Sequence, residues 1–108
     1  MRVIHVQDAE GYNPARFVAR PFIEGDHANV RLIRLAPGQA LPPHGHGVSD
    51  LFLYVVEGAG ELDTPEGAIP FGAGALAHYR GEEELRVRNA GEAGMTLLAF
   101  LAPKFATS

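Results

Sequence analysis

Hydrophobic and polar positions alternate along this chain in short blocks, and glycine- and proline-rich turns separate the blocks. No apolar stripe with a period of 3.6 residues is long enough to indicate a helix. The pattern predicts nine strands, at 2–6, 16–22, 29–35, 51–57, 60–63, 68–71, 75–79, 85–88 and 95–102. We therefore expect an all-β protein whose strands form a sandwich or a small barrel.

Two of these strands are apolar almost without interruption, at 51–56 and 95–101. Such runs are typical of strands that are covered on both faces. A chain this small has little to cover the outside of a sheet, so we expect a homodimer. Pro21 cannot donate to a strand ladder, which predicts that its strand lies at a sheet edge or ends there.

Length and composition narrow the classes of function. A chain of 108 residues fits a single domain, which we place at 1–108. Its net charge of -4 is opposite to what a phosphate backbone selects, so nucleic acid is not expected as a partner. We find neither a membrane-length apolar run nor a signal peptide, which predicts no membrane partner and a cytoplasmic location. Because the chain has no cysteine, a metal would need His, Asp, Glu or Gln ligands.

The residues with the clearest chemical potential are His44 and His46, on either side of Gly45. Positions i and i+2 of an extended chain point to the same face, with Cα atoms roughly 6.5 to 7 Å apart. Two imidazoles with this spacing can converge on one ion. The alternative is a pair of solvated histidines in a loop rich in glycine and proline.

The surroundings of these histidines resemble a known family. Pro37-Gly38, five further residues, His44-Gly45-His46 and an apolar strand ending in Glu57-Gly58 resemble the first motif of the cupin superfamily. Gly74, followed by a loop and Asn89-Ala90-Gly91, resembles the second motif. The resemblance covers about residues 30–103, and it implies a double-stranded β-helix, or jelly-roll barrel.

The resemblance also implies a metal held by both histidines of the first motif, a later glutamate and a histidine of the second motif. The glutamate position falls on Leu51, or on Asp50 if the strand carries a one-residue bulge. The second histidine position falls on Leu85. His78 can take that place if a six-residue loop follows it, because it then faces the interior. A five-residue loop instead turns Tyr79 inward and His78 outward.

The candidate metal ligands are therefore His44 and His46, with His78 and Asp50 as further candidates. The resemblance implies a divalent transition metal, namely zinc, nickel, iron, manganese or copper. It also implies a small-molecule ligand, a homodimer, and a metal-dependent dioxygenase or isomerase.

Two other functions remain open. In a non-catalytic, metal-free small-molecule-binding cupin, Leu51 and Leu85 would fill space that metal ligands no longer need. In a metal-free cupin resembling sugar epimerases, a histidine would act as a base.

Overall fold

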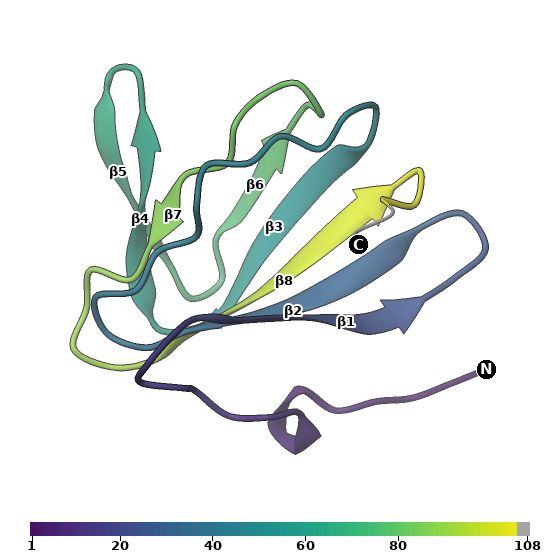
Figure 1. The fold of residues 1–108 in the computed structure, drawn as a ribbon, viewed down its shortest axis with the longest axis horizontal. Helices are drawn as coiled ribbons and strands as arrows, with labels where there is room; N and C mark the ends of the chain where they lie inside the picture. Colours follow the sequence, from purple (N-terminus) through teal and green to yellow (C-terminus); the bar gives the residue numbers. More distant parts are fainter. Residues whose placement is uncertain (106–108) are drawn as a thin grey trace.

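The computed structural model describes residues 1–105, in which eight strands form two antiparallel sheets of a jelly-roll barrel (Figure 1). The five-stranded sheet has the order β1-β2-β8-β3-β6, and the three-stranded sheet has the order β5-β4-β7. The strands are β1 (Val18–Glu24), β2 (Asn29–Leu35), β3 (Asp50–Glu57), β4 (Ala59–Thr64), β5 (Gly67–Gly72), β6 (Leu76–Tyr79), β7 (Val87–Arg88) and β8 (Met95–Ala102). The fold class predicted from the sequence is confirmed.

Most strand boundaries agree with the sequence pattern. The strands predicted at 29–35 and 95–102 coincide with β2 and β8, and the other predicted strands that form differ from the observed ones by one or two residues at one or both ends. Pro21 lies in β1, an edge strand, and the pairing with β2 shifts register between Pro21 and Ile23. The edge position predicted from this proline is confirmed.

The strand predicted at 2–6 is wrong. This segment is not paired with a strand, and a 3-10 turn, η1 (Val6–Asp8), begins at its last residue. The buried guanidinium of Arg34 on β2 donates to the backbone oxygens of Val6, at 2.7 Å, and Glu10, at 2.8 Å. Because a side chain satisfies these carbonyls, the segment is held against the sheet without a strand ladder. Figure 1 shows it running below β1 and β2.

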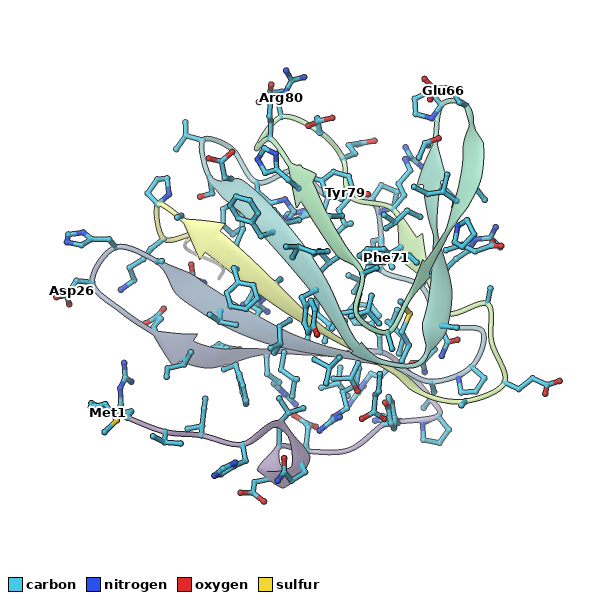
Figure 2. The ribbon with its side chains drawn as sticks, turned by 180° about the vertical axis from the view of Figure 1, so that it is seen from behind. Met1, Asp26, Glu66, Phe71, Tyr79 and Arg80 are labelled. Carbon is cyan, nitrogen blue, oxygen red and sulfur yellow. The ribbon has the colours of Figure 1, made fainter. Side chains whose placement is uncertain are left out.

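The core lies between the two sheets, where alternate side chains of each strand point inward. In Figure 2, Phe71 lies between the β4–β5 hairpin and the five-stranded sheet. The buried core cluster consists of Ile33, Leu35, Leu51, Leu53, Val55, Leu62, Phe71, Leu85, Val87, Met95, Leu97, Ala99 and Leu101. Within the described residues, no helix is long and apolar enough to span a membrane.

The outer face of β3 is the side for which the sequence predicts a cover from a second copy, and within one chain it is exposed. Phe52 and Tyr54 alternate with buried residues and are 41% and 37% exposed. Phe100 of β8 lies opposite Phe52, and Leu76 of β6 lies opposite Tyr54, so the exposed side chains are adjacent. We call these four residues the outer apolar face. His78 and Asp50 border this face beside Phe52, while the four residues themselves present apolar and aromatic surface that can meet an identical face.

We predict that two copies associate through the outer apolar face. Three strands about 4.8 Å apart and about 20 Å long present roughly 300 Å², less than the roughly 800 Å² that each partner buries in a stable complex. The expected dimer is therefore weak, and Phe52→Lys should abolish it. Sedimentation equilibrium over a range of concentrations measures this, with Ile69→Lys on β5 as the control. A monomer up to several hundred micromolar would contradict the prediction.

Candidate functional site

A cavity of about 260 Å³ opens between the five-stranded sheet and the segment that links β2 to β3. Its wall is formed by Phe17, Ala19, Arg31, Ile33, Leu41, Pro42, Pro43, His44, His46, Leu51, Leu85, Ala99, Leu101 and Phe105. The two imidazoles and the Arg31 guanidinium are the ionisable groups among these residues, and none of them is acidic. The wall is therefore mainly apolar, with three nitrogen-bearing side chains among its residues.

Backbone hydrogen bonds place both histidines on this wall. The segment that carries them runs antiparallel to residues 81–89. The carbonyl of His44 accepts from the Leu85 amide at 3.0 Å, and the His46 amide donates to the Gly81 carbonyl at 2.7 Å. Gly81 has no room for a side chain, because an added Cβ would lie 2.0 Å from the Gly47 oxygen. The extended backbone thus turns both imidazoles toward the cavity, as their spacing predicts.

The two imidazoles meet each other and a third ring. The centroids of His44 and His46 are 4.9 Å apart with the planes at 87°, and Phe105 packs edge-on at 5.7 Å and 5.3 Å from them. Aromatic pairs favour this edge-to-face arrangement. His46 is only 7% exposed, whereas His44 is exposed. The two histidines of the motif therefore have different environments.

Leucines occupy the two inward positions where the family resemblance places further ligands. Leu51 is 0% exposed and Leu85 is 3% exposed, and both belong to the core cluster and line the cavity. A buried leucine supplies apolar contacts and no donor atom. At both positions, the cavity wall next to the histidines therefore consists of hydrocarbon side chains.

The other two candidate ligands lie elsewhere. In the pairing of β3 with β6, Leu51 faces Tyr79 and Phe52 faces His78. Because Leu51 points inward, Tyr79 does too, and in Figure 2 it lies on the side of β6 turned toward the three-stranded sheet. His78 points outward, stacks on Phe52 at 4.8 Å and contacts Asp50 through Nε2 and Oδ1 at 2.9 Å.

Of the two arrangements considered for His78, the one with the shorter loop is found. β6 ends at Tyr79, so five residues, 80–84, precede Leu85. Asp50 is exposed and lies on the outward face of β3, next to the inward Leu51. The structure thus brings His44 together with His46, and His78 together with Asp50, but it separates the two pairs by the thickness of the sheet.

The donor set does not fit the metal site that the family resemblance implies. Residues 1–105 contain no group of three or more His, Cys, Asp or Glu that could share an ion. Metal-bound imidazoles almost always donate their other ring N–H to a partner. If an ion took Nε2 of His46, the proton would remain on Nδ1, which is buried without a hydrogen-bond partner. A buried unpaired donor costs about 1 to 3 kcal/mol.

Sequence reasoning missed three residues of the site. Arg31 has no motif around it, yet it faces the cavity in line with Ile33. Phe105 lies beyond the last strand, and Gly81 is one of thirteen glycines. The alternation of the strand at 29–35 could have indicated Arg31. Alternate residues of a strand point to the same face, and the apolar residues at 33 and 35 predict that this face is the inward one.

Burial lowers the pKa of His46 below its ordinary value of 6.5, and the neighbouring His44 lowers it further. The unfolded chain therefore takes up a proton near pH 6.5, while the folded chain takes it up only at lower pH. We predict that stability falls as the pH drops through 6.5, and that the loss ends below the folded pKa. Melting temperatures between about pH 5 and pH 8 measure this.

His46→Gln should reduce this loss of stability on acidification. The exposed His27 provides the control, because His27→Gln should leave the dependence unchanged. An equal slope in wild type and His46→Gln would show that other groups cause the acid sensitivity.

The comparisons with known proteins agree with the geometry. The family model described as "Cupin domain" matches residues 31–101. The chain is similar to a solved protein from Thermus thermophilus, with 27% identity, a TM-score of 0.86, and coverage of 96% of this chain and 99% of that one. An RmlC-like cupin protein from Desulfovibrio desulfuricans has 26% identity, a TM-score of 0.85, and coverage of 97% and 99%.

A more distant structure is a predicted oxalate decarboxylase from Thermotoga maritima, with 20% identity, a TM-score of 0.66, and coverage of 72% of this chain and 68% of that one. At this identity the likeness concerns the fold alone. The comparison with curated proteins found no match. Since the family model spans well over half of the sequence, this chain belongs to the cupin domain family.

Proposed function

We propose that this cupin binds a small, largely apolar molecule in the cavity beside its histidine pair, without a resident metal. The observation that carries the proposal is the wall itself, where Leu51 and Leu85 replace donor residues beside His44 and His46. Ligand sites in proteins are typically apolar with a few polar groups that fix orientation. The cavity has both properties.

The volume limits the size of the ligand. An apolar cavity of about 150 Å³ accommodates benzene, so a cavity of 260 Å³ suits a single ring with a short substituent, or about ten non-hydrogen atoms. Phenyl and branched aliphatic side chains of the wall provide apolar contacts for such a body. A polymer, a nucleotide or a long acyl chain would not fit inside.

The protonation state of the His46 imidazole restricts which polar group the ligand can carry. Its pKa is lowered by burial, so the ring is neutral at pH 7 and carries one proton. Nδ1 is buried without a partner, and a proton there would be an unpaired buried donor. We therefore assign the proton to Nε2, whose N–H can donate to a ligand in the cavity that His46 lines. A ligand with one acceptor oxygen, such as a carbonyl, meets this requirement.

Charge gives a further restriction. The ionisable groups among the cavity residues are Arg31, His44 and His46, and no carboxylate lies among them. A cationic ligand would lose its hydration without gaining an opposite charge. Neutral molecules with an acceptor oxygen are therefore preferred over amines.

We predict that acetophenone binds the wild-type protein. Isopropenylbenzene has nearly the same shape but no acceptor oxygen, so it should bind about tenfold more weakly, as expected for one lost hydrogen bond. Benzylamine, a cation, should not bind. Chemical-shift titration of the protein gives the three affinities.

Ala99→Leu should abolish this binding, because the larger side chain fills the cavity that Ala99 lines. Ala102→Leu, on the exposed side of the same strand, is the matched control and should bind like wild type. Equal binding to both variants would mean that the compound lies elsewhere and would refute the proposal.

The second candidate function is the metal-dependent dioxygenase or isomerase implied by the family resemblance. The observation in its favour is the convergence of two imidazoles whose centroids lie 4.9 Å apart. Ligands from the substrate or from water would have to complete the coordination. This candidate and the metal-free binding protein differ in metal content.

We predict that protein purified without an affinity tag or added metal contains well under one equivalent of any transition metal. Elemental analysis of the wild type and of a His44→Ala, His46→Ala double variant measures the metal content. The expected result is the same low content in both proteins, because two imidazoles alone make an incomplete site. About one equivalent in wild type that is lost in the double variant would instead support the metal enzyme.

A further inference from the structure

The chain beyond β8 turns back over the barrel, and two buried side chains hold it there. The Ser49 hydroxyl donates to the Pro103 carbonyl at 2.6 Å, and the Phe105 amide donates to Oδ1 of Asn29 at 2.9 Å. Ser49 is 2% exposed and Asn29 is 5% exposed. Asn29 begins β2 and Ser49 precedes β3, the two neighbours of β8 in the sheet. The segment is thus tied to both sides of the strand it leaves.

This anchoring places the Phe105 ring at the polar end of the cavity. The ring packs edge-on against His44 and His46 and is itself part of the cavity wall. A ligand oxygen that reaches the imidazoles must lie next to this ring. The apolar body of the ligand then extends toward the strands, where Ile33, Leu51 and Ala99 line the wall.

Phe105 differs from the rest of this wall in how it is held. Ile33, Leu51 and Ala99 belong to central strands, where the hydrogen bonds of the sheet fix their positions. Phe105 follows the last strand, is half-buried, and is placed by two side-chain hydrogen bonds of its segment. A change of this side chain therefore alters the cavity without rebuilding the sheet.

We infer that Phe105 determines the size of the molecule that the cavity accepts. Its ring closes the space beside the histidine pair, so the wild-type site takes a one-ring ligand with an acceptor oxygen and excludes a two-ring ligand. This inference rests on the proposed function, because it assigns the selectivity of the same cavity. Phe105 acts as a specificity-determining residue through steric closure and edge-on contact with the ligand.

The test compares acetophenone with acetylnaphthalene, which carries the same acceptor group on two fused rings. Wild type should bind acetophenone at least tenfold more tightly. In Phe105→Ala the cavity opens beside the imidazoles, so the preference should fall to about threefold or less, or reverse. Phe100→Ala removes an exposed phenylalanine from the outside of β8 and should keep the wild-type preference.

A second variant keeps the inference testable if Phe105→Ala does not fold. Phe105→Leu retains an apolar side chain but is smaller than a phenyl ring, and it should lower the preference part of the way. Phe105→Trp gives a separate readout, because the chain has no tryptophan. Its emission should shift when cyclohexanone enters the cavity, whereas an indole outside the ligand site would not respond.

The outcomes separate this inference from the proposed function. If acetophenone binds and the preference is the same in wild type, Phe105→Ala and Phe105→Leu, then Phe105 does not set ligand size and the inference is refuted, while the cavity remains a binding site. If acetophenone, acetylnaphthalene and cyclohexanone all fail to bind at millimolar concentration, the proposed function is refuted, and this inference is refuted with it.

Discussion

The register of β3 between its two neighbours determines what the interior of this barrel can do. A strand has a side-chain period of two, so a shift of one residue exchanges its two faces completely. Here Leu51 pairs with Leu101 of β8 and with Tyr79 of β6, and all three side chains point inward. The same register sends Asp50 and His78 to the outside. The chemistry of the cavity is therefore a consequence of strand pairing as much as of which residues the chain contains.

The inward leucines and the buried imidazole have the same effect on the cavity, because both disfavour charge inside it. A cavity lined by hydrocarbon penalises charge, and it lowers the pKa of His46 so that the ring stays neutral at pH 7. An acidic side chain at the Leu51 position would favour the protonated ring by its charge. With leucine there, the apolar wall and the neutral ring both favour an uncharged ligand. The proposed ligand preference rests on this wall, which offers no carboxylate to balance a cationic ligand.

Much of the fold follows from the sequence alone, because alternation and turn chemistry are local. The strand at 95–102 is predicted to the residue, since both inward and outward positions are apolar and a turn precedes it. The N-terminal segment at 2–6 resembles a strand because its apolar and polar residues follow one another as they do in the edge strand of a sheet. Its backbone groups are satisfied instead by Arg34, and a contact between residues 28 positions apart leaves no local pattern.

The site was predictable only in part, for the same reason. The spacing of His44 and His46 fixes their common face, and the structure places both on the cavity wall. The direction of His78 depended on the length of one loop, which residue counting left open. Phe105 had no signal at all, because its position depends on hydrogen bonds that its segment makes with Ser49 and Asn29, both distant in sequence.

The selectivity of the cavity and the stability of the barrel therefore depend on different parts of the chain. Strand residues such as Leu51 and Leu101 pack the core, and replacing them by smaller side chains would cost about 2 to 5 kcal/mol. Phe105 lies at the margin of that core, where a substitution alters the cavity at lower cost to the fold. A barrel of this kind can change its ligand by changing the segment after its last strand, while the sheet register that excludes Asp50 and His78 from the interior stays the same.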